Sequence, residues 1–301
     1  MSFAYIGGIR IVKIELINIC KKFGKKEALR DISFNIEEGI NGLIGANGAG
    51  KTTLIRLLID YYKPSSGKLI LHDDVGSNYD SKRNLNFKEI IGYLPQYFEG
   101  ISYFTVDEFI DYIALLKNMD LKDTKSRKKE LIEIFSLTEF SNKKLKNLSG
   151  GTLRRVGIVQ ALINNPKILI LDEPSAGLDP RERIILKNFL NNYAEDKIVI
   201  LSSHIISDVE DISKNIFMLN NGELILSSNI EDLQLKEGYN SWKVKLNYEE
   251  YNKALKQYLI RNAKEIDEGI YEVRILSKLK PYENAISVRP SLEDIYLSYY
   301  Q

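Results

Sequence analysis

The sequence predicts an α/β fold, in which helices cover the faces of a sheet of largely parallel strands. Strand-like and helix-like segments alternate along most of the 301 residues, which is the pattern that builds such layers. The runs Ile168–Leu171 and Lys197–Leu201 are almost continuously apolar, as expected of parallel strands buried on both faces. A glycine-rich loop between the apolar run Gly42–Ile44 and the helical run Leu54–Ile59 indicates a strand–loop–helix unit.

The elements of the first hundred residues are predicted from alternation and turn residues. Apolar residues alternate well enough to predict strands at Ile11–Asn18 and Ile32–Ile36. The turn Pro64–Gly67 is expected to lead into a short strand, Lys68–Leu71. A further strand is expected at Glu89–Leu94.

The middle of the chain has helical spacing. Apolar residues recur at helical intervals from Val106 to Phe135. The charged stretch Lys125–Glu130 within this region is expected to be a solvated helix face. Another helix is expected at Leu153–Ile163.

The character of the sequence changes after the turn Asn220–Gly222. Tyr, Lys and Glu become frequent, strands are expected at Ser241–Leu246 and Ile270–Ile275, and a helix is expected at Tyr248–Arg261. The stretch Pro290–Asp294 has the pattern of a cap for a last helix. We therefore expect a small C-terminal α/β domain.

Composition excludes several classes of function. Lys and Arg number 42 and Asp and Glu number 41, so the nearly neutral chain is not expected to bind nucleic acid broadly. The single cysteine, Cys20, excludes an internal disulfide and fits a reducing cytosol. No apolar run approaches the roughly 18–20 residues that span a bilayer. Arg10, Lys13 and Glu15 interrupt the apolar residues near the N-terminus, which argues against a signal peptide.

The glycine-rich loop makes the first chemical prediction. Residues 45–53 follow the pattern G-x-x-x-x-G-K-[ST] of a phosphate-binding loop. Its glycines allow backbone N–H groups to surround an anion, and the positive end of the following helix adds to that site. Lys51 is expected to reach the β- and γ-phosphates, and Thr52 to hold Mg²⁺ through its hydroxyl. The nucleotide-binding residues expected here are Asn47, Gly48, Ala49, Gly50, Lys51, Thr52 and Thr53.

Two adjacent carboxylates, Asp172 and Glu173, follow the buried run Ile168–Leu171 directly. Because uncompensated carboxylates beside an apolar strand are unfavourable, a chemical role is expected. Asp172 is placed to help hold Mg²⁺, as the second acidic part of a nucleoside triphosphatase site. Glu173 is then free to polarise the attacking water as a general base. The alternative is a cap cluster for the helix near Pro180.

A second anion-binding surface is expected at Ser149, Gly150 and Gly151, which precede the predicted helix Leu153–Ile163 at its N-terminus. A serine and two glycines alone are weak evidence. The phosphate-binding loop upstream and the carboxylate pair downstream make the combination specific.

The order of these motifs resembles that of the nucleotide-binding subunit of an ABC transporter over roughly residues 12–230. The resemblance implies the ABC ATPase fold, with a RecA-like core, an antiparallel β subdomain and an α-helical subdomain at about residues 97–160. The expected domains are an N-terminal extension at 1–10, the ATPase domain at 11–230 and a C-terminal accessory domain at 236–301. The segments that carry the resemblance are Gly45–Thr53, Gln96, Leu148–Gly151, Ile168–Pro174, Ser175–Asp179 and His204.

The resemblance also implies a head-to-tail dimer with ATP and Mg²⁺ as ligands. Each ATP is expected to lie between the phosphate-binding loop of one chain and Ser149–Gly151 of the other. Gln96 corresponds to the residue that senses Mg²⁺ and the attacking water, and His204 to the switch histidine at the γ-phosphate. Ser175–Asp179 matches the loop that joins the two sites. The expected catalytic residues are therefore Glu173, His204, Gln96 and Lys51, and the expected metal ligands are Thr52, Gln96 and Asp172.

The sequence departs from the family pattern at three positions. Phe23 occupies the place of a tyrosine that stacks on adenine, and it keeps the aromatic face, whose stacking on bases is worth about 1–3 kcal/mol. Core packing is the alternative role for Phe23. Ala46 replaces a common proline, and Thr152 replaces the more usual glutamine or methionine, so a polar contact from Thr152 to the opposite nucleotide is not predicted.

By the same resemblance, a separate membrane-spanning subunit is expected to hold the chain at the inner face of the cell membrane. The aromatic segment Tyr97–Phe104 suits docking of a short helix of that subunit, with burial inside the helical subdomain as the alternative. The ending Pro290–Leu297 resembles ATPases of the ABC-2 exporter group, which implies export. The rival hypothesis is an ABC ATPase that acts in translation or on DNA without a membrane subunit. The cargo, and whether the dimer contains one or two kinds of chain, stay open.

Overall fold

The computed structural model describes residues 11–74, 78–80, 87–203, 205–233, 235 and 238–299. The chain divides into two compact units, Met1–Ser228 and Asn229–Gln301, which we call unit 1 and unit 2. Within the described ranges, no helix combines the length and the apolar character needed to cross a membrane. The expected N-terminal extension, residues 1–10, lies outside the described residues.

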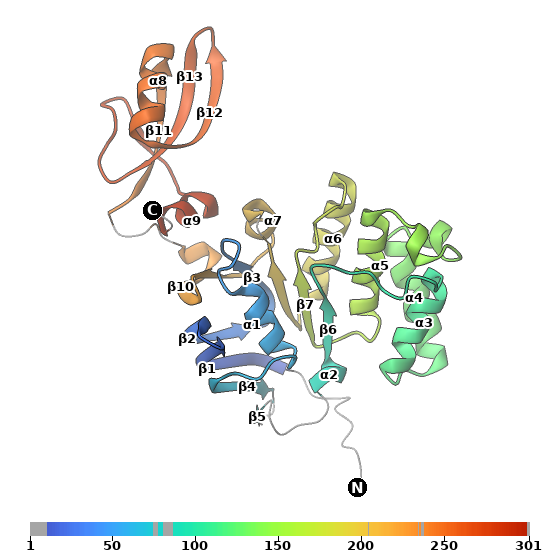
Figure 1. The fold of residues 1–301 in the computed structure, drawn as a ribbon. Coiled ribbons are helices and arrows are strands. Elements are labelled where there is room, and N and C mark those ends of the chain that lie inside the picture. Colours follow the sequence, from blue (N-terminus) through green and yellow to red (C-terminus); the bar gives the residue numbers. More distant parts are fainter. Residues whose placement is uncertain are drawn as a thin grey trace. The chain divides into compact units, whose positions relative to one another are not determined.

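Unit 1 contains an antiparallel sheet with strand order β2-β1-β4-β5 (Figure 1). β1 pairs antiparallel with both β2 and β4. β1 and β2 extend beyond the predicted strands, because Lys22 and Phe23 still pair with Glu27 and Lys26 beside a tight turn. The strands of this sheet are β1 (Ile11–Phe23), β2 (Lys26–Glu37), β4 (Ser66–Asp73) and β5 (Asn78–Asp80).

The second sheet of unit 1 has the order β10-β9-β3-β8-β7-β6. Strand β3 is parallel to β8 and β9, and β7 is parallel to β8 and β6. All residues of β7 and β8 are buried, as their continuous apolar runs predicted. The carboxyl ends of these parallel strands therefore meet at one edge of the sheet, where ligands bind in such folds. The six strands are β3 (Gly39–Ile44), β6 (Ile91–Leu94), β7 (Ile168–Asp172), β8 (Ile198–Ser202), β9 (Asn215–Asn220) and β10 (Glu223–Asn229).

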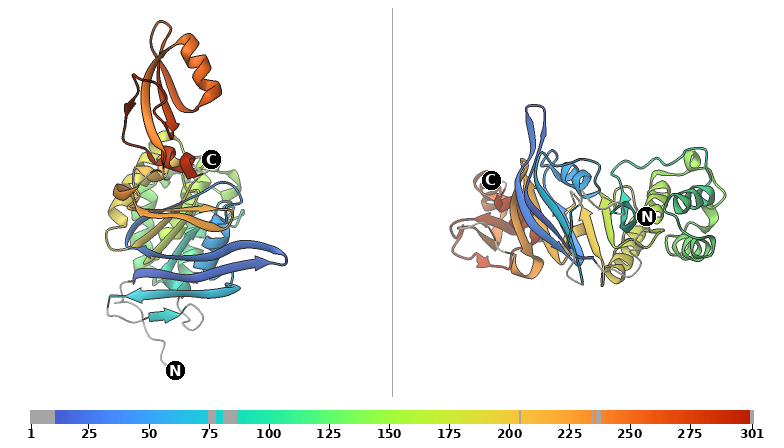
Figure 2. Two further views of the ribbon diagram at one scale, coloured as in Figure 1. Left: turned by 90° about the vertical axis from the view of Figure 1, so that its left-hand side faces the viewer. Right: turned by 90° about the horizontal axis from the view of Figure 1, so that it is seen from below.

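Helix α1 (Lys51–Leu58) contributes to one apolar core together with both sheets of unit 1. Leu54, Ile55 and Leu58 of this helix are at most 1% exposed, and they pack in a cluster that includes residues of β1, β3 and β7. Helix α6 (Pro180–Tyr193) lies on the other side of the six-stranded sheet (Figure 2), where the short helix α7 (Ile206–Glu210) also packs against β3. The helix that begins at the phosphate-binding loop is thus held rigidly in the core.

A helical subdomain follows β6 along the chain (Figure 1). The predicted helical region is divided, because Asn118 adopts a left-handed φ of 55° and the Asp120 side chain then accepts hydrogen bonds that cap a new helix. Thr105 and Glu108 form a capping box at the first helix. The elements are α3 (Val106–Leu116), α4 (Leu121–Ile134), the 3₁₀ turns η1 (Thr138–Phe140) and η2 (Leu145–Asn147), and α5 (Gly150–Leu162).

Two predicted elements were partly wrong. The first two residues of the predicted strand Glu89–Leu94 belong to a one-turn helix, α2 (Phe87–Ile90). Only Ile91–Leu94 forms a strand, β6. The predicted helix Tyr248–Arg261 ends at Gln257, because Tyr258 is extended and the following residues pair with a neighbouring strand. Leu259 and the β-branched Ile260, a residue type that favours strands, belong to that strand.

Unit 2 contains a four-stranded sheet, in the order β12-β13-β11-β14, and helix α8 packs on it. Val244, Leu246, Val273 and Ile275 of the sheet form its core with Ala254 of the helix. The elements of this unit are η3 (Ile230–Asp232), β11 (Asn240–Asn247), α8 (Tyr248–Gln257), β12 (Leu259–Asp267), β13 (Ile270–Ser277), β14 (Ile286–Ser287) and α9 (Leu292–Tyr299).

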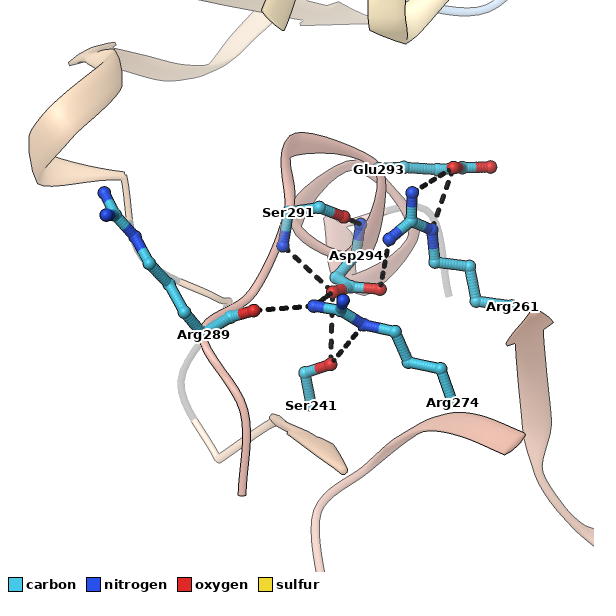
Figure 3. Close-up of polar contacts among 7 residues, drawn as sticks. All are labelled: Ser241, Arg261, Arg274, Arg289, Ser291, Glu293 and Asp294. Atoms are coloured by element: carbon cyan, nitrogen blue, oxygen red, sulfur yellow. Dashed lines mark hydrogen bonds and ion pairs between the residues drawn. The ribbon is translucent and has the colours of Figure 1, made fainter. Parts of the chain in front are cut away.

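The last helix, α9, is tied to this sheet by the buried carboxylate of Asp294 (Figure 3). Its Oδ2 accepts hydrogen bonds from Ser241 Oγ at 3.1 Å, Arg274 Nη2 at 2.5 Å and the N–H of Ser291 at 2.9 Å. Arg261 Nη1 lies 3.6 Å from Oδ1. The N–H of Asp294 donates to Ser291 Oγ at 3.2 Å, so this stretch caps α9 as predicted.

Candidate nucleotide-binding site

The glycine-rich loop connects β3 to α1 and requires glycine at two positions. Gly45 has a φ of 155°, and a Cβ there would lie 2.4 Å from the carbonyl oxygen of Leu219. Gly50 precedes α1 with a φ of 112°, and its Cβ would lie 2.9 Å from Leu29 Cδ2. Larger residues would therefore displace the loop. Residues Ala46 to Thr53 line a cavity of about 1050 Å³. Every residue of this loop that we expected to bind nucleotide is therefore in the cavity wall.

Lys51 lies at the base of this cavity and is 8% exposed. Its Nζ donates to the carbonyl oxygens of Gly45 at 2.6 Å and Ala46 at 3.2 Å, so the ammonium is held inside the loop. Burial lowers the pKa of Lys51, and the negative charges of Glu173 and Asp172 oppose that shift. A buried ammonium facing two carboxylates is suited to a polyanionic ligand.

Asp172 is the last residue of β7, and Thr52 lines the same cavity. The Oδ1 atom of Asp172 accepts a hydrogen bond from Ser202 Oγ at 2.5 Å. Among the described residues, the buried Oδ2 atom has no hydrogen-bond partner. Burial raises the pKa of Asp172, with the Ser202 hydrogen bond opposing. Mg²⁺ prefers oxygen ligands. The Oδ2 atom of Asp172 and the hydroxyl of Thr52 are oxygen atoms of this kind, from two residues that line the same cavity.

Glu173 follows Asp172 with a left-handed φ of 55°, which is unusual for a glutamate. Its backbone N–H donates to the carbonyl oxygen of Ser202 at 3.1 Å and to Ser202 Oγ at 3.2 Å. The residue is 6% exposed and lines the cavity. Strained backbone of this kind costs about 1–3 kcal/mol and is concentrated at functional sites.

Arg154 of α5 connects two segments beside the cavity, Pro95–Gln96 after β6 and Asp172–Glu173 at the end of β7. The sequence analysis did not predict this role. Its Nη1 donates to the carbonyl oxygens of Pro95 at 2.7 Å and Gln96 at 2.9 Å. Its Nη2 donates to the carbonyl oxygens of Asp172 and, at 2.7 Å, Glu173. The side chain thus holds Gln96, which lines the cavity, in a fixed relation to the end of β7.

Ser149, Gly150 and Gly151 form the N-terminus of α5, with Ser149 as the N-cap, so the helix begins three residues before the predicted start at Leu153. Ser149 Oγ accepts from the N–H of Thr152 at 3.2 Å and lies 2.9 Å from Thr152 Oγ1. Within the described part of the chain, these three residues are not among those that line the cavity. A Cβ on Gly151 would lie 2.7 Å from the carbonyl oxygen of Gly177, so α5 begins close to the Ser175–Asp179 loop.

Phe23 and His204 are the two remaining residues that we expected at the nucleotide site. Phe23 is 42% exposed and packs edge-on against Tyr62, with ring centroids 5.1 Å apart. It is not one of the described residues that line the cavity. His204 lies outside the described residues.

The cavity has a second wall that the sequence did not reveal. Hairpin residues between β1 and β2 and the turn after β9 contribute to it. A lysine pair beside Phe23 and an Asn-Gly turn were visible in the sequence, but only the strand pairing brings them to the loop. These lining residues are Lys25, Lys26, Glu27, Ala28 and Arg30 of the hairpin, and Asn221 and Gly222 after β9. Tyr97, which follows Gln96, also lines the cavity.

Fold and cavity together define a nucleotide-binding α/β protein with a phosphate-binding loop. A family model described as ABC transporter matches residues 29–176. The uncharacterized ABC transporter ATP-binding protein YxlF of Bacillus subtilis is 31% identical over 228 residues, which cover 75% of this chain and 74% of that protein. The uncharacterized ABC transporter ATP-binding protein sll0415 of Synechocystis is 36% identical over 288 residues, which cover 91% and 78%.

Solved structures agree with these relatives. The dimeric structure of MJ0796, a bacterial ABC transporter cassette, has a TM-score of 0.63 and 27% identity, and the match covers 73% of this chain and all of that one (100%). A post-hydrolysis dimer of the same cassette, bound to ADP and Pi, has a TM-score of 0.62 and 26% identity. The chain belongs to the ABC transporter ATP-binding proteins. It is the ATP-binding subunit of an ABC transporter and an ATPase, and its fold is the predicted ABC ATPase fold.

Proposed function

We propose that this chain hydrolyses MgATP in the cavity described above and thereby drives export through a separate membrane subunit. One observation carries the proposal: the phosphate-binding loop and Asp172, whose Oδ2 has no partner among the described residues, line the same cavity at one edge of the sheet. Backbone N–H groups of residues 47–53 and the ammonium of Lys51 bind the phosphates. Stacking of the adenine on Phe23 completes nucleotide binding.

Thr52, Gln96 and Asp172 hold the magnesium ion in this proposal. A magnesium ion there neutralises the charge that develops on the transferred phosphoryl group. Glu173 is the general base for the attacking water, and its strained backbone supports that assignment. Gln96 orients the water and His204 contacts the γ-phosphate.

The active form in this proposal is a head-to-tail dimer. Ser149 and Gly150 are exposed at the N-terminus of α5, outside the cavity of their own chain. Backbone N–H groups at a helix N-terminus favour a phosphate, so these residues are available to the ATP of a second chain. The dimeric MJ0796 structures support this arrangement.

The membrane subunit docks on the helical subdomain, which would hold the chain at the inner face of the membrane. Tyr97 is 84% exposed and Tyr103 is 71% exposed, and exposed tyrosines are enriched at protein interfaces. Phe98, by contrast, packs on Phe109 with ring centroids 5.8 Å apart, so it supports the subdomain from inside. We expect Tyr103→Ala to weaken co-purification with the membrane subunit more than Lys125→Ala, a control on α4.

A Ser149→Arg variant tests the shared site. The isolated chain should bind MgATP with unchanged affinity, because Ser149 does not line its own cavity among the described residues. Hydrolysis by the assembled complex should fall by at least about a hundredfold per affected site, since a phosphate-binding group is lost from the transition state. A Ser149→Arg complex that hydrolyses ATP at the wild-type rate would contradict the proposed dimer.

A further inference from the structure

A cluster of aromatic rings and cations lies at the hairpin that borders the nucleotide cavity. Phe23, the last residue of β1, pairs with Lys26 of β2. Lys25 and Lys26, across the turn from Phe23, line the cavity, so Phe23 lies beside residues of the cavity wall.

The ring that contacts Phe23 is Tyr62, which comes from the other end of the phosphate-binding helix. Asp60 turns the chain with a φ of 58°, and the N–H groups of Tyr61 and Tyr62 donate to the Arg56 carbonyl oxygen at 2.9 and 3.0 Å. Tyr62 is thereby fixed to α1, the helix that begins at Lys51.

Two cations hold Tyr62 in place. Lys21 Nζ lies 5.0 Å from the ring centroid of Phe23 and 5.1 Å from that of Tyr62, and it donates to the Lys63 carbonyl oxygen at 2.8 Å. The guanidinium of Arg56 lies 5.7 Å from the Tyr62 ring centroid, and its Nη1 donates to Tyr62 Oη at 3.2 Å. These cation-to-ring distances are within the range of cation–π attraction.

We propose that Tyr62, held by Lys21 and Arg56, is a positioning residue that fixes the Phe23 ring for stacking on the nucleotide base. The inference rests on the proposed function, in which Phe23 receives the adenine. Phe23 ends a strand at a hairpin tip and is 42% exposed, so its ring needs a partner to be held in one orientation. A ring fixed before binding loses less conformational freedom when the base arrives.

The arrangement also links base and phosphate recognition through one helix. Residues at the start of α1 bind the phosphates, and residues just after its end position the base-stacking ring. The helix has eight residues, a length of about 12 Å. Loss of Tyr62 should therefore weaken recognition of the base while the phosphate-binding loop, at the other end of α1, keeps its geometry.

The test is calorimetric titration of the full chain with MgATP and, separately, with magnesium tripolyphosphate, which has no base. Tyr62→Leu should raise the dissociation constant of ATP about three- to tenfold, the range that loss of one aromatic pair contact spans. Phe23→Leu should have an effect of at least that size, and the double variant should add little to it. Affinity for tripolyphosphate should stay unchanged in all three variants.

Two further variants separate positioning from folding. Tyr62→Phe loses the hydrogen bond from Arg56 but keeps the ring and both cation–π contacts, so its ATP affinity should be much closer to the wild-type value than that of Tyr62→Leu. Tyr112→Leu is a matched control, because Tyr112 is 38% exposed, packs edge-on against Phe104 with ring centroids 5.7 Å apart, and is not among the described residues that line the cavity; its ATP affinity should equal that of the wild type. Wild-type ATP affinity in Tyr62→Leu, or an equal loss of tripolyphosphate binding, would overturn the inference. Unchanged ATP binding in Lys51→Ala would instead overturn the proposed function.

Discussion

Arg154 donates a hydrogen bond from its guanidinium to the backbone carbonyl oxygen of Asp172, the residue that ends β7. The same guanidinium bonds the carbonyl oxygens of Pro95, Gln96 and Glu173. One side chain of α5 therefore fixes both the Pro95–Gln96 segment and the end of β7 beside the cavity. In the proposed dimer, a shift of α5 on contact with a second chain would be transmitted through Arg154 to Gln96 and to the Asp172–Glu173 pair.

Substitution of Arg154 by methionine should reduce both stability and catalysis. Four carbonyl oxygens lose their donor, and leaving buried acceptors unpaired should lower the unfolding free energy by about 2–4 kcal/mol. The turnover number should fall at least about tenfold, because the two loops lose their fixed relation. Urea unfolding and steady-state ATPase assays on the same preparation measure both effects.

Arg155→Met is the matched control for that experiment. Arg155 is also buried, donates to the carbonyl oxygens of Phe135 and Ser136, and pairs with Glu182 at 2.9 Å. It contacts neither loop of the cavity among the described residues. A similar stability loss with a smaller loss of turnover is expected, and equal loss of turnover in both variants would contradict the role of Arg154.

Asp172→Asn should stabilise the chain without nucleotide and weaken the proposed magnesium site. Burial raises the pKa of Asp172 above 3.8, its value in the unfolded chain. The free energy of unfolding therefore falls as the pH rises from 3.8 through the raised pKa of Asp172. Above that pKa, the full loss of stability is present. Because the substituted asparagine amide carries no charge, the variant's advantage should be full above the raised pKa of Asp172 and should shrink as the pH falls through that pKa toward 3.8.

Urea unfolding of both proteins across this pH range measures the Asp172 effect, and nucleotide titration with and without Mg²⁺ measures the metal site. An asparagine variant that is less stable than the wild type at pH 8, or one that keeps the full magnesium dependence of ATP binding, would refute this account of Asp172.

Glu173→Gln should bind ATP normally and hydrolyse it slowly. Loss of the general base is expected to lower the rate about 10²–10⁴-fold. Because the nucleotide then persists between the two chains, the closed dimer should accumulate with MgATP. Size-exclusion chromatography with light scattering, alongside single-turnover assays, checks both statements. Wild-type turnover in this variant would exclude Glu173 as the general base.

Asp294→Ala should loosen α9 from unit 2. Asp294 is 1% exposed and faces Arg261 and Arg274, and removal of one partner from a buried ion pair costs about 3–5 kcal/mol. Hydrogen exchange should increase in residues 292–299 and in β11. Ser298→Ala, on the same helix, should have a smaller effect, and equal exchange in both variants would show that Asp294 is not the main tie.

The phosphate-binding loop and the Asp172–Glu173 pair could be predicted because local sequence determines both. Glycines, a lysine and a threonine at fixed spacing define the loop, and two carboxylates after a continuous apolar run define the strand end. The parallel order of the strands then brings both to one edge, which the α/β pattern already implied.

Other parts depend on contacts between distant segments. In the sequence, Arg154 and Arg155 are two adjacent charged residues of one helix, and nothing distinguishes them. Only the packing of α5 against β6 and β7 shows that they bind different carbonyl oxygens. Tyr62 meets Phe23 through the pairing of β1 and the turn after α1. Strand β12 was missed because Tyr258–Arg261 continues an apolar helical spacing, whereas the pairing with β13 determines the observed structure.

The most direct test of the transporter function is affinity purification of the tagged Glu173→Gln chain from detergent-solubilised native membranes in MgATP, with Lys51→Ala as the control. We expect a polytopic membrane protein in stoichiometric amount with both variants, and two ATPase chains per complex held together by ATP only in Glu173→Gln. Recovery of the chain only from the soluble fraction, with ribosomes or DNA and no membrane protein, would contradict the account.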